Sequence, residues 1–364
     1  QRQMCIRDRP ETDSAPLRVL VAGTPEVAVP VLEAVADSRH ELVGVLTRPD
    51  APRGRRRVLT PSPVAARAEQ LGVETVKAAR LRGDGSASAV ERLREITPDV
   101  VLVVAYGALV PADLLRLPRL GWLNLHFSAL PAYRGAAPVQ HAVMFGEESI
   151  DAVVFQIEQG LDTGPVFGRV SRPIAPGETA GEILTDLAVA GAPLCTRVLD
   201  ELADGTAQAT PQVGEPSHAP KLTHLDGLID PSGEAHRVAA NVNGVTPEPG
   251  AWGWLATDAP DAEPTRFTLV GAHPVGEDEL PDSVRSAATG ALEVAAARTW
   301  LRTGTGALRL DRVKAAGKKL MPARDWANGR PAGARLLCGE ELADRRGATD
   351  GAATDGPSEE TRRA

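Results

Sequence analysis

Three polar side chains that could act together in catalysis occur close to one another in the sequence. Asn124 and His126 are separated by one residue at the end of the apolar run 122–126, and Asp162 lies between glycines in the segment 160–164. Alternate residues of a β-strand point to the same face. We therefore expect the carboxamide and the imidazole on one face at the end of a strand, which is typical of the mouth of an active site.

These three groups suit the transfer of an acyl group to an amine. The imidazole of His126 titrates near neutral pH and can take a proton from an attacking amine. The carboxamide of Asn124 can donate a hydrogen bond to the oxyanion that forms on the attacked carbonyl. The carboxylate of Asp162 can orient the imidazole and stabilise its protonated form. Because no Ser or Cys nucleophile is needed, the set favours direct attack by the amine over a covalent acyl-enzyme intermediate.

Each of these residues also has a simpler interpretation. A single histidine is more often a hydrogen-bonded structural residue than a catalyst, and an aspartate between glycines often bonds its own backbone in a turn. The combination of Asn124, His126 and the Ser-Ala-Leu-Pro turn that follows them is what favours catalysis. The other histidines have no metal-ligand spacing, so the sequence predicts no metal site.

The elements that must position these residues follow an alternating pattern. Strand-like runs occur at 17–23, 41–47, 73–77 and 99–105, and helical segments near 25–37, 62–71 and 88–96 separate them. This alternation predicts an α/β fold, a parallel sheet with helices on both faces. Such sheets bind ligands at the carboxyl ends of their strands. The G-x-G-x-x-G spacing of dinucleotide-binding proteins is missing after Gly23, which disfavours nicotinamide chemistry.

The rest of the chain predicts a second, smaller domain. A long helical stretch is expected over 177–203, and the Pro- and Gly-rich residues 204–222 read as a linker. Beyond the linker, short strand-like runs separated by turn residues predict a small β-barrel; they lie at 250–255, 266–270, 291–294 and 307–310. We expect residues 1–16 to be a disordered or artefactual leader and residues 338–364 to be a disordered tail.

Composition narrows the classes of function. The chain has 364 residues, 43% of them hydrophobic, which is enough for two domains with their own cores. Its formal net charge is −8, so contact with nucleic acid must come from a local basic patch. Cys5, Cys195 and Cys338 are too few and too far apart for a disulfide framework or a zinc site, which favours a reducing, cytoplasmic location. No apolar run approaches the roughly 20 residues that span a bilayer.

Short motifs spread along the chain carry a resemblance to a known family. The resemblance covers roughly residues 17–337 in the family's order and spacing. It rests on Ala22-Gly23-Thr24-Pro25, Thr47-Arg48-Pro49-Asp50, Pro61-Ser62-Pro63-Val64, Val104-Ala105-Tyr106-Gly107, Asn124-Leu125-His126, Arg134-Gly135-Ala136-Ala137-Pro138, Gly160-Leu161-Asp162-Thr163-Gly164, Val245-Thr246-Pro247-Glu248-Pro249-Gly250-Ala251-Trp252 and Ala316-Gly317-Lys318-Lys319-Leu320-Met321-Pro322. These motifs resemble those of the methionyl-tRNA formyltransferase family. The resemblance implies a Rossmann-like parallel-sheet formyltransferase domain at 17–203 and an OB-like tRNA-binding β-barrel domain at 223–337.

The resemblance also implies an activity. It is the transfer of the formyl group of 10-formyltetrahydrofolate to the α-amine of initiator methionyl-tRNA, for translation initiation, with Asn124, His126 and Asp162 as the catalytic residues. The resemblance places the folate co-substrate on a turn made by Ser128, Ala129, Leu130 and Pro131. We expect a monomer that needs no metal.

A cluster of arginines is the candidate contact with tRNA. Its five members lie within ten residues and are opposed only by Asp50; they are Arg48, Arg53, Arg55, Arg56 and Arg57. A charge run is usually a solvated loop, but in an acidic protein such a density of arginine also suits contact with phosphates. The resemblance places the loop that contacts the acceptor stem here. Lys318 and Lys319 are expected to add contacts to the tRNA backbone.

Two other functions remain open. A folate-dependent formyltransferase that acts on a small amine, such as glycinamide ribonucleotide or an amino sugar, would share Asn124, His126 and Asp162. It would not need the Arg-rich loop or the second domain. A non-catalytic RNA-binding protein with the same fold would need the basic residues but not the intact Asn, His and Asp set.

Overall fold

The computed structural model of the protein describes residues 14–53 and 57–352. The chain divides into two compact units. The first comprises the residues up to Pro138, 149–172 and 184–219, and the second comprises 139–148, 173–183 and the residues from Pro220 onward. This division differs from the predicted one because 139–148 and 173–183 belong to the second unit and 204–219 to the first.

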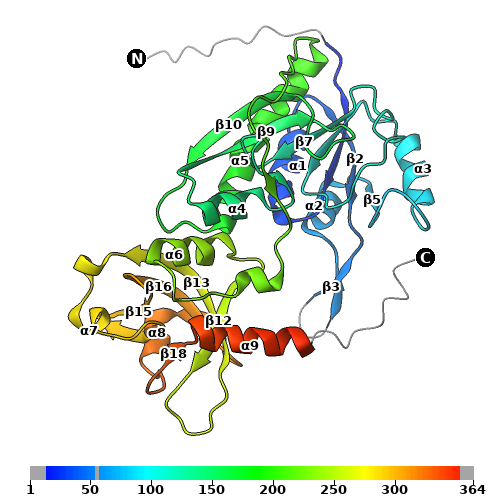
Figure 1. Ribbon diagram of the computed structural model, residues 1–364. Helices are drawn as coiled ribbons and strands as arrows, with labels where there is room; N and C mark the ends of the chain where they lie inside the picture. Colours follow the sequence, from blue (N-terminus) through cyan, green and yellow to red (C-terminus); the bar gives the residue numbers. More distant parts are fainter. Residues whose placement is uncertain (1–13, 54–56, 353–364) are drawn as a thin grey trace, which may run out of the picture. The chain divides into compact units, whose positions relative to one another are not determined.

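A seven-stranded sheet forms the centre of the first unit (Figure 1). In spatial order its strands are β10 (Val166–Pro173), β9 (Ser149–Gln156), β7 (Trp122–His126), β6 (Val100–Val104), β1 (Arg18–Gly23), β2 (Glu41–Thr47) and β5 (Thr75–Lys77). The five strands from β7 to β5 are parallel, and β9 pairs antiparallel with β7. The predicted Rossmann-like parallel sheet is confirmed.

Helices cover both faces of this sheet. They are α1 (Val29–Ala36), which follows the short helix η1 (Glu26–Ala28), α2 (Pro63–Leu71), α3 (Ala87–Ile96) and α5 (Ala180–Ala203). Leu93 of α3 belongs to the same buried cluster as Trp122 of β7. The side chain of Leu125 on β7 points to the opposite face of the sheet, where it lies against α5. A Cβ on Gly191 of α5 would lie 2.8 Å from this side chain. Asn124 and His126 therefore share the α3 side of the sheet with Trp122.

The order of the strands reverses between β1 and β6. Chain connections leave the two strands in opposite directions at this point, so their carboxyl ends form the crevice where open α/β sheets bind ligands. Gly23 ends β1 beside Val104, and a Cβ on Gly23 would lie 2.6 Å from Ala28 Cβ and 2.9 Å from the Val104 carbonyl oxygen. Only glycine allows this close approach of strand and helix.

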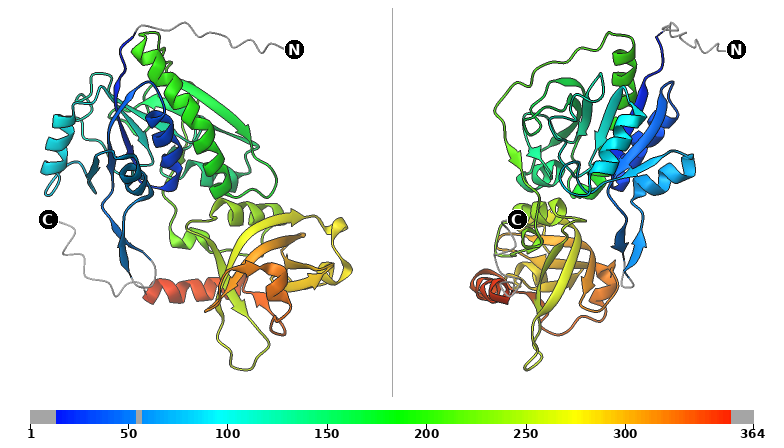
Figure 2. Two further views of the ribbon diagram at one scale, coloured as in Figure 1. Left: turned by 180° about the vertical axis from the view of Figure 1, so that it is seen from behind. Right: turned by 90° about the vertical axis from the view of Figure 1, so that its right-hand side faces the viewer.

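A hairpin extends from the first unit's sheet at the Arg-rich segment (Figure 2). It consists of β3 (Ala51–Arg53) and β4 (Val58–Thr60), which pair antiparallel. The sequence analysis predicted only a charged loop here. Val58 and Leu59 of β4 are both exposed, so the hairpin presents apolar as well as basic side chains to solvent.

The second unit contains the predicted antiparallel barrel. Its strands in spatial order are β14 (Leu292–Ala295), β15 (Arg298–Arg302), β16 (Ala307–Ala315), β13 (Thr265–Val275), β12 (Ala251–Ala256) and β18 (Arg335–Leu336), with β17 (Met321–Pro322) paired to β16. An antiparallel bridge between Ala291 and Arg335 joins the two ends of this sheet and closes it. Phe267, Leu301 and Val313 are fully buried in the core.

Shorter elements complete the described chain. They are β8 (Arg134–Gly135), which pairs with β11 (His218–Ala219), α4 (Pro138–Phe145), η2 (His224–Gly227), α6 (Ala235–Gly244), η3 (Glu277–Glu279), α7 (Asp282–Arg285), α8 (Ala323–Ala327) and α9 (Gly339–Ala352). Across residues 14–53 and 57–352, no helix has the length and apolar character that crossing a membrane requires.

Helix α9 corrects one expectation. Residues 338–364 were predicted to be a disordered tail, and this is wrong for 339–352 because specific contacts hold the helix. Leu342 is only 5% exposed, Arg335 pairs with Glu341, and the Arg345 guanidinium lies 4.8 Å from the ring centroid of Trp254. A polar composition hides this single apolar anchor. Residues 1–13 and 353–364, which hold the rest of the predicted leader and tail, lie outside the described residues.

Replacing the anchor of α9 is expected to destabilise the second unit. Leu342→Ala removes a buried side chain and leaves a cavity, which costs about 2 kcal/mol at the low end for leucine. We would measure the free energy of unfolding in urea, with Asp344→Ala on the same helix as the exposed control. Equal stability of the two variants would show that α9 does not pack on the barrel.

Candidate active site

The proposed catalytic strand ends in two polar side chains on one face. Asn124 lies opposite Val103 on β6 and Phe155 on β9, and His126 lies opposite Val153 on β9. His126 is 5% exposed, whereas Asn124 is half-buried. In the described chain no group hydrogen-bonds the Asn124 carboxamide, so its N–H groups can bind a ligand.

The ring of His126 is fixed in orientation and in tautomer. Its Nε2 lies 3.1 Å from the backbone oxygen of Tyr133. Because a carbonyl oxygen only accepts, Nε2 carries the hydrogen and Nδ1 is the nitrogen that can take a proton. The ring also meets Phe155 edge to face, with 6.2 Å between the centroids.

The protonation of His126 follows from its surroundings. Burial lowers the pKa of the imidazole below its usual value, since a charged ring is poorly solvated there. The negative charge of Asp162 and the bond to the Tyr133 carbonyl act in the opposite direction and raise the pKa without restoring it. The ring is therefore neutral near pH 7 and can act as a base, and Asp162 stabilises the charge that it gains.

Asp162 is held in the loop between β9 and β10. Its backbone is in the left-handed region with a φ of 50°, and its Oδ2 accepts the Gly135 N–H at 2.8 Å. Among the described contacts there is no hydrogen bond between His126 and Asp162. The two interact through charge, whereas the sequence analysis expected the carboxylate to orient the ring.

The glycines on both sides of Asp162 are required by close approaches. A Cβ on Gly164 would collide with the backbone oxygen of Gln156, and a Cβ on Gly160 would collide with the side chain of Thr163. Larger residues at these positions would displace the loop and with it the carboxylate. The loop is therefore a built part of the site and not a spacer.

The turn proposed to bind folate is mostly internal. Ser128 is fully buried and its hydroxyl donates to the Ala132 carbonyl at 2.7 Å, and Leu130 packs in an apolar cluster with Val153 and Phe155. Pro131 is buried as well, so only Ala129 is exposed. Side chains of the turn thus hold its shape, and contact with a ligand would fall to Ala129 and to backbone groups.

The basic candidates lie in both units, and each unit contributes its own set. Arg48 is exposed and donates to the Gly107 carbonyl at 2.9 Å, and Arg57 is exposed beside β4. Arg53 belongs to β3, whereas Arg55 and Arg56 lie outside the described residues. Lys318 and Lys319 are exposed in the turn after β16.

Sequence reasoning missed two backbone groups that hold the candidate residues, and it did not name two exposed basic side chains. Tyr133 and Gly135 act through a backbone carbonyl and a backbone N–H, which residue types do not reveal. Arg312 and Lys314 are exposed on β16, close in sequence to Lys318. Their separation by one buried valine is a strand pattern that could have identified them.

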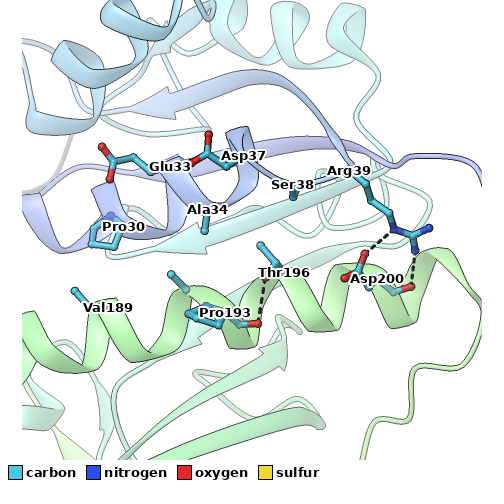
Figure 3. Close-up of a pocket in the computed structure, with 11 residues that line it drawn as sticks. Pro30, Glu33, Ala34, Asp37, Ser38, Arg39, Val189, Pro193, Thr196 and Asp200 are labelled. Carbon is cyan, nitrogen blue, oxygen red and sulfur yellow. Dashed lines mark hydrogen bonds and ion pairs between the residues drawn. The ribbon is translucent and has the colours of Figure 1, made fainter. Parts of the chain in front are cut away.

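A groove elsewhere in the first unit is separate from this site. A groove of about 650 Å³ lies between α1 and α5 (Figure 3). Arg39 lies across one end of it and bonds Asp200 at 2.6 Å. None of the candidate residues lines the groove. In the part of the chain that the structure describes, no cluster of His, Cys, Asp and Glu could hold a metal ion.

Two family models match the chain. The formyl transferase model matches residues 17–199, and the model of the formyl transferase C-terminal domain matches residues 221–331. The solved structure of WlaRD, a sugar 3N-formyl transferase in the presence of dTDP and 5-N-formyl-THF, aligns with a TM-score of 0.58 and 13% identity over 83% of this chain and 99% of that one. At that identity the likeness shows a shared fold.

Curated relatives are closer. The methionyl-tRNA formyltransferase of Paenarthrobacter aurescens (strain TC1) is 47% identical over 86% of this chain and 97% of the relative. That of Salinispora arenicola (strain CNS-205) is 49% identical over 90% of this chain and 100% of the relative. With both formyl transferase domains present and whole-length relatives at this identity, the chain belongs to the methionyl-tRNA formyltransferase family.

Proposed function

We propose that this protein transfers the formyl group of 10-formyltetrahydrofolate to the α-amine of initiator methionyl-tRNA, for translation initiation. The observation that carries the proposal is the set formed by Asn124 and His126 at the end of β7 and by Asp162 in the loop between β9 and β10. It stands in a chain that matches methionyl-tRNA formyltransferases over nearly their whole length.

The chemistry proceeds by direct attack of the amine on the formyl carbon. A C–N bond forms to the methionyl nitrogen, and the negative charge that develops on the formyl oxygen is stabilised by the carboxamide N–H of Asn124. Nδ1 of His126 takes the proton of the amine and returns it to the folate nitrogen as the old C–N bond breaks. No covalent enzyme intermediate is formed.

The environment of His126 supports this role as a proton shuttle. A base must be neutral before the reaction and charged in the middle of it, and burial together with a nearby carboxylate meets both needs. Asp162 supplies the compensating charge while its own oxygen stays bonded to the Gly135 N–H. The proposed steps use these side chains alone and call on no metal.

The two substrates would use different parts of the chain. The folate donor would bind along the turn of Ser128, Ala129, Leu130 and Pro131, the segment that follows the catalytic strand. The tRNA would contact basic residues, namely Arg48, Arg53, Arg55, Arg56 and Arg57 together with Lys318 and Lys319. Of these, Arg48, Arg57, Lys318 and Lys319 are described as exposed. We further propose that the protein acts as a monomer in the cytoplasm. Transfer to a small amine is not favoured, because relatives that are 47–49% identical over 86–90% of this chain are methionyl-tRNA formyltransferases.

The first test is a formylation assay across a salt series. The protein should formylate methionyl-tRNA, with glycinamide ribonucleotide and an amino-sugar nucleotide as competing acceptors that stay unmodified. Arg57→Ala, and Lys318→Ala with Lys319→Ala, should flatten the log–log dependence of tRNA affinity on salt by about 0.7–0.9 for each lost phosphate contact.

Arg94→Ala is the matched control, an exposed arginine on α3 whose loss should leave the salt slope unchanged. Equal slopes in all variants would show that these basic residues are solvated and do not contact tRNA phosphates. Formylation of a small acceptor would contradict the proposal that methionyl-tRNA is the substrate.

Loss of the oxyanion donor should lower the rate of the chemical step. Asn124→Ala removes a carboxamide that has no other described partner, so kcat is expected to fall about 10²–10³-fold with little change in the KM for tRNA. Single-turnover kinetics would report the chemical step directly. A defect confined to KM would mean that Asn124 only positions the substrate.

The pH profile tests the pair of His126 and Asp162. The neutral imidazole is the active form, so kcat/KM should fall as pH drops through the pKa of His126. The charge of Asp162 raises this pKa, so Asp162→Asn should lower it further and move the acidic limb to lower pH while kcat also falls. Combined with His126→Ala, the defects should be less than multiplicative because the residues act as a unit. An acidic limb that does not move would exclude charge coupling between them.

A further inference from the structure

The segment that follows α5 is hydrogen-bonded to loops of the proposed active site. Residues 210–219, here called the strap, are anchored at both ends, by the bridge between Thr210 and Val166 and by the pairing of Ala219 with Gly135. Composition predicted this segment to be a linker. From 211 to 218 every side chain is exposed except that of Gln212, and its neighbour Val213 is 90% exposed.

Gln212 joins two loops of the site through all the hydrogen-bonding groups of its amide. Its Nε2 donates to the backbone oxygens of Asp162 and Gly164, both at 2.8 Å. Its Oε1 accepts from Nη2 of Arg134 at 2.6 Å. A primary amide offers two N–H donors and one oxygen, so the side chain is used in full.

These bonds hold the backbone of Asp162, whereas its carboxylate is held separately. The residue has a left-handed backbone and no strand or helix to hold it. Gln212 holds its backbone oxygen, and the Gly135 N–H holds its carboxylate. Arg134, next to Gly135, is bonded to the same glutamine, so both ends of the aspartate are tied to one frame.

A second residue of the strap reaches His126 in the same indirect way. The Ser217 hydroxyl accepts the Tyr133 N–H at 2.8 Å, and its backbone exchanges bonds with Arg134 at 2.8 Å and Pro131 at 3.2 Å. The Tyr133 carbonyl is the group that bonds Nε2 of His126. Ser217 therefore holds the peptide that orients the imidazole.

We propose that the strap positions the catalytic pair, with Gln212 fixing Asp162 and Ser217 fixing the Tyr133 peptide that orients His126. The two strap residues are positioning residues, since neither contacts the ring of His126 or the carboxylate of Asp162. The inference rests on the proposed function for its kinetic consequences. Displacing a catalytic group by about 1 Å can cost a factor of 10² in rate, so small shifts of these loops matter.

Gln212→Glu tests the two hydrogen bonds that Gln212 Nε2 donates to the backbone oxygens of Asp162 and Gly164. Glutamate keeps the length of the side chain and an oxygen for Arg134, but it places a carboxylate against two carbonyl oxygens. We expect kcat to fall about 10–100-fold with the KM for tRNA unchanged. The control is Gln208→Glu, the same substitution at an exposed glutamine without a described partner. An unchanged kcat in Gln212→Glu, or an equal loss in both variants, would overturn the proposal.

Variants of Ser217 distinguish a positioning role from an effect on stability alone. Ser217→Ala removes the acceptor for the Tyr133 N–H and loosens the carbonyl that raises the pKa of His126, so the acidic limb of kcat/KM should move to lower pH. Ser217→Thr keeps the hydroxyl and should restore the wild-type limb. A lowered Tm in Ser217→Ala with an unmoved limb would show a purely structural role.

Hydrogen exchange distinguishes this inference from the proposed function. In Gln212→Glu the Gly135 amide, which donates to Asp162, should exchange faster than in wild type and in Gln208→Glu, and this requires no substrate. If the wild-type protein formylates no acceptor, the proposed function fails while faster exchange still supports the strap. Unchanged exchange, or faster exchange with normal kcat, contradicts the strap.

Discussion

The hydrogen bond from the Gly135 N–H to the carboxylate of Asp162 is the contact on which the geometry of the site depends. A carboxylate beside a buried imidazole would otherwise be free to bond the ring or to turn toward solvent. Bound to a backbone amide at 2.8 Å, it keeps its charge near His126 without taking a ring nitrogen. In the proposed mechanism the imidazole then keeps Nδ1 for the proton of the substrate, because Nε2 is engaged by Tyr133.

This arrangement divides the work between strand and loops. Asn124 and His126 lie on β7, in the interior of a sheet whose neighbouring strands fix their backbone on both sides. Asp162 lies on a loop whose position is set by glycines, by Gly135 and by Gln212. Rigid strands give precise placement to the two groups that are proposed to meet the substrate, and a loop holds the charged group in a left-handed backbone conformation outside regular structure.

The sequence predicted the parts of the molecule that side chains determine. The alternation of apolar strands and helices gave the parallel sheet, and the spacing of Asn124 and His126 gave their common face. It could not predict contacts made by backbone groups, such as the Tyr133 carbonyl and the Gly135 N–H, because any residue carries them. Composition was misleading for α9 and for the strap. A single residue fixes each segment in place, the buried Leu342 in α9 and the hydrogen-bonded Gln212 in the strap. Their many polar neighbours dominate the average composition of each segment.

The average composition is also a poor guide to where the protein could bind a negatively charged ligand. A protein with a formal net charge of −8 repels a polyanion on average, so recognition of tRNA would require basic side chains held away from the acidic background. The hairpin of β3 and β4 has this property, since it extends from its sheet and carries Arg57 beside exposed Val58 and Leu59. Exposed apolar residues are unfavourable in water unless a partner covers them, and their presence next to arginine fits a surface that meets both the phosphates and the less polar groups of one ligand. A small amine would cover neither, so the hairpin is the part of the first unit that argues most directly for a macromolecular substrate.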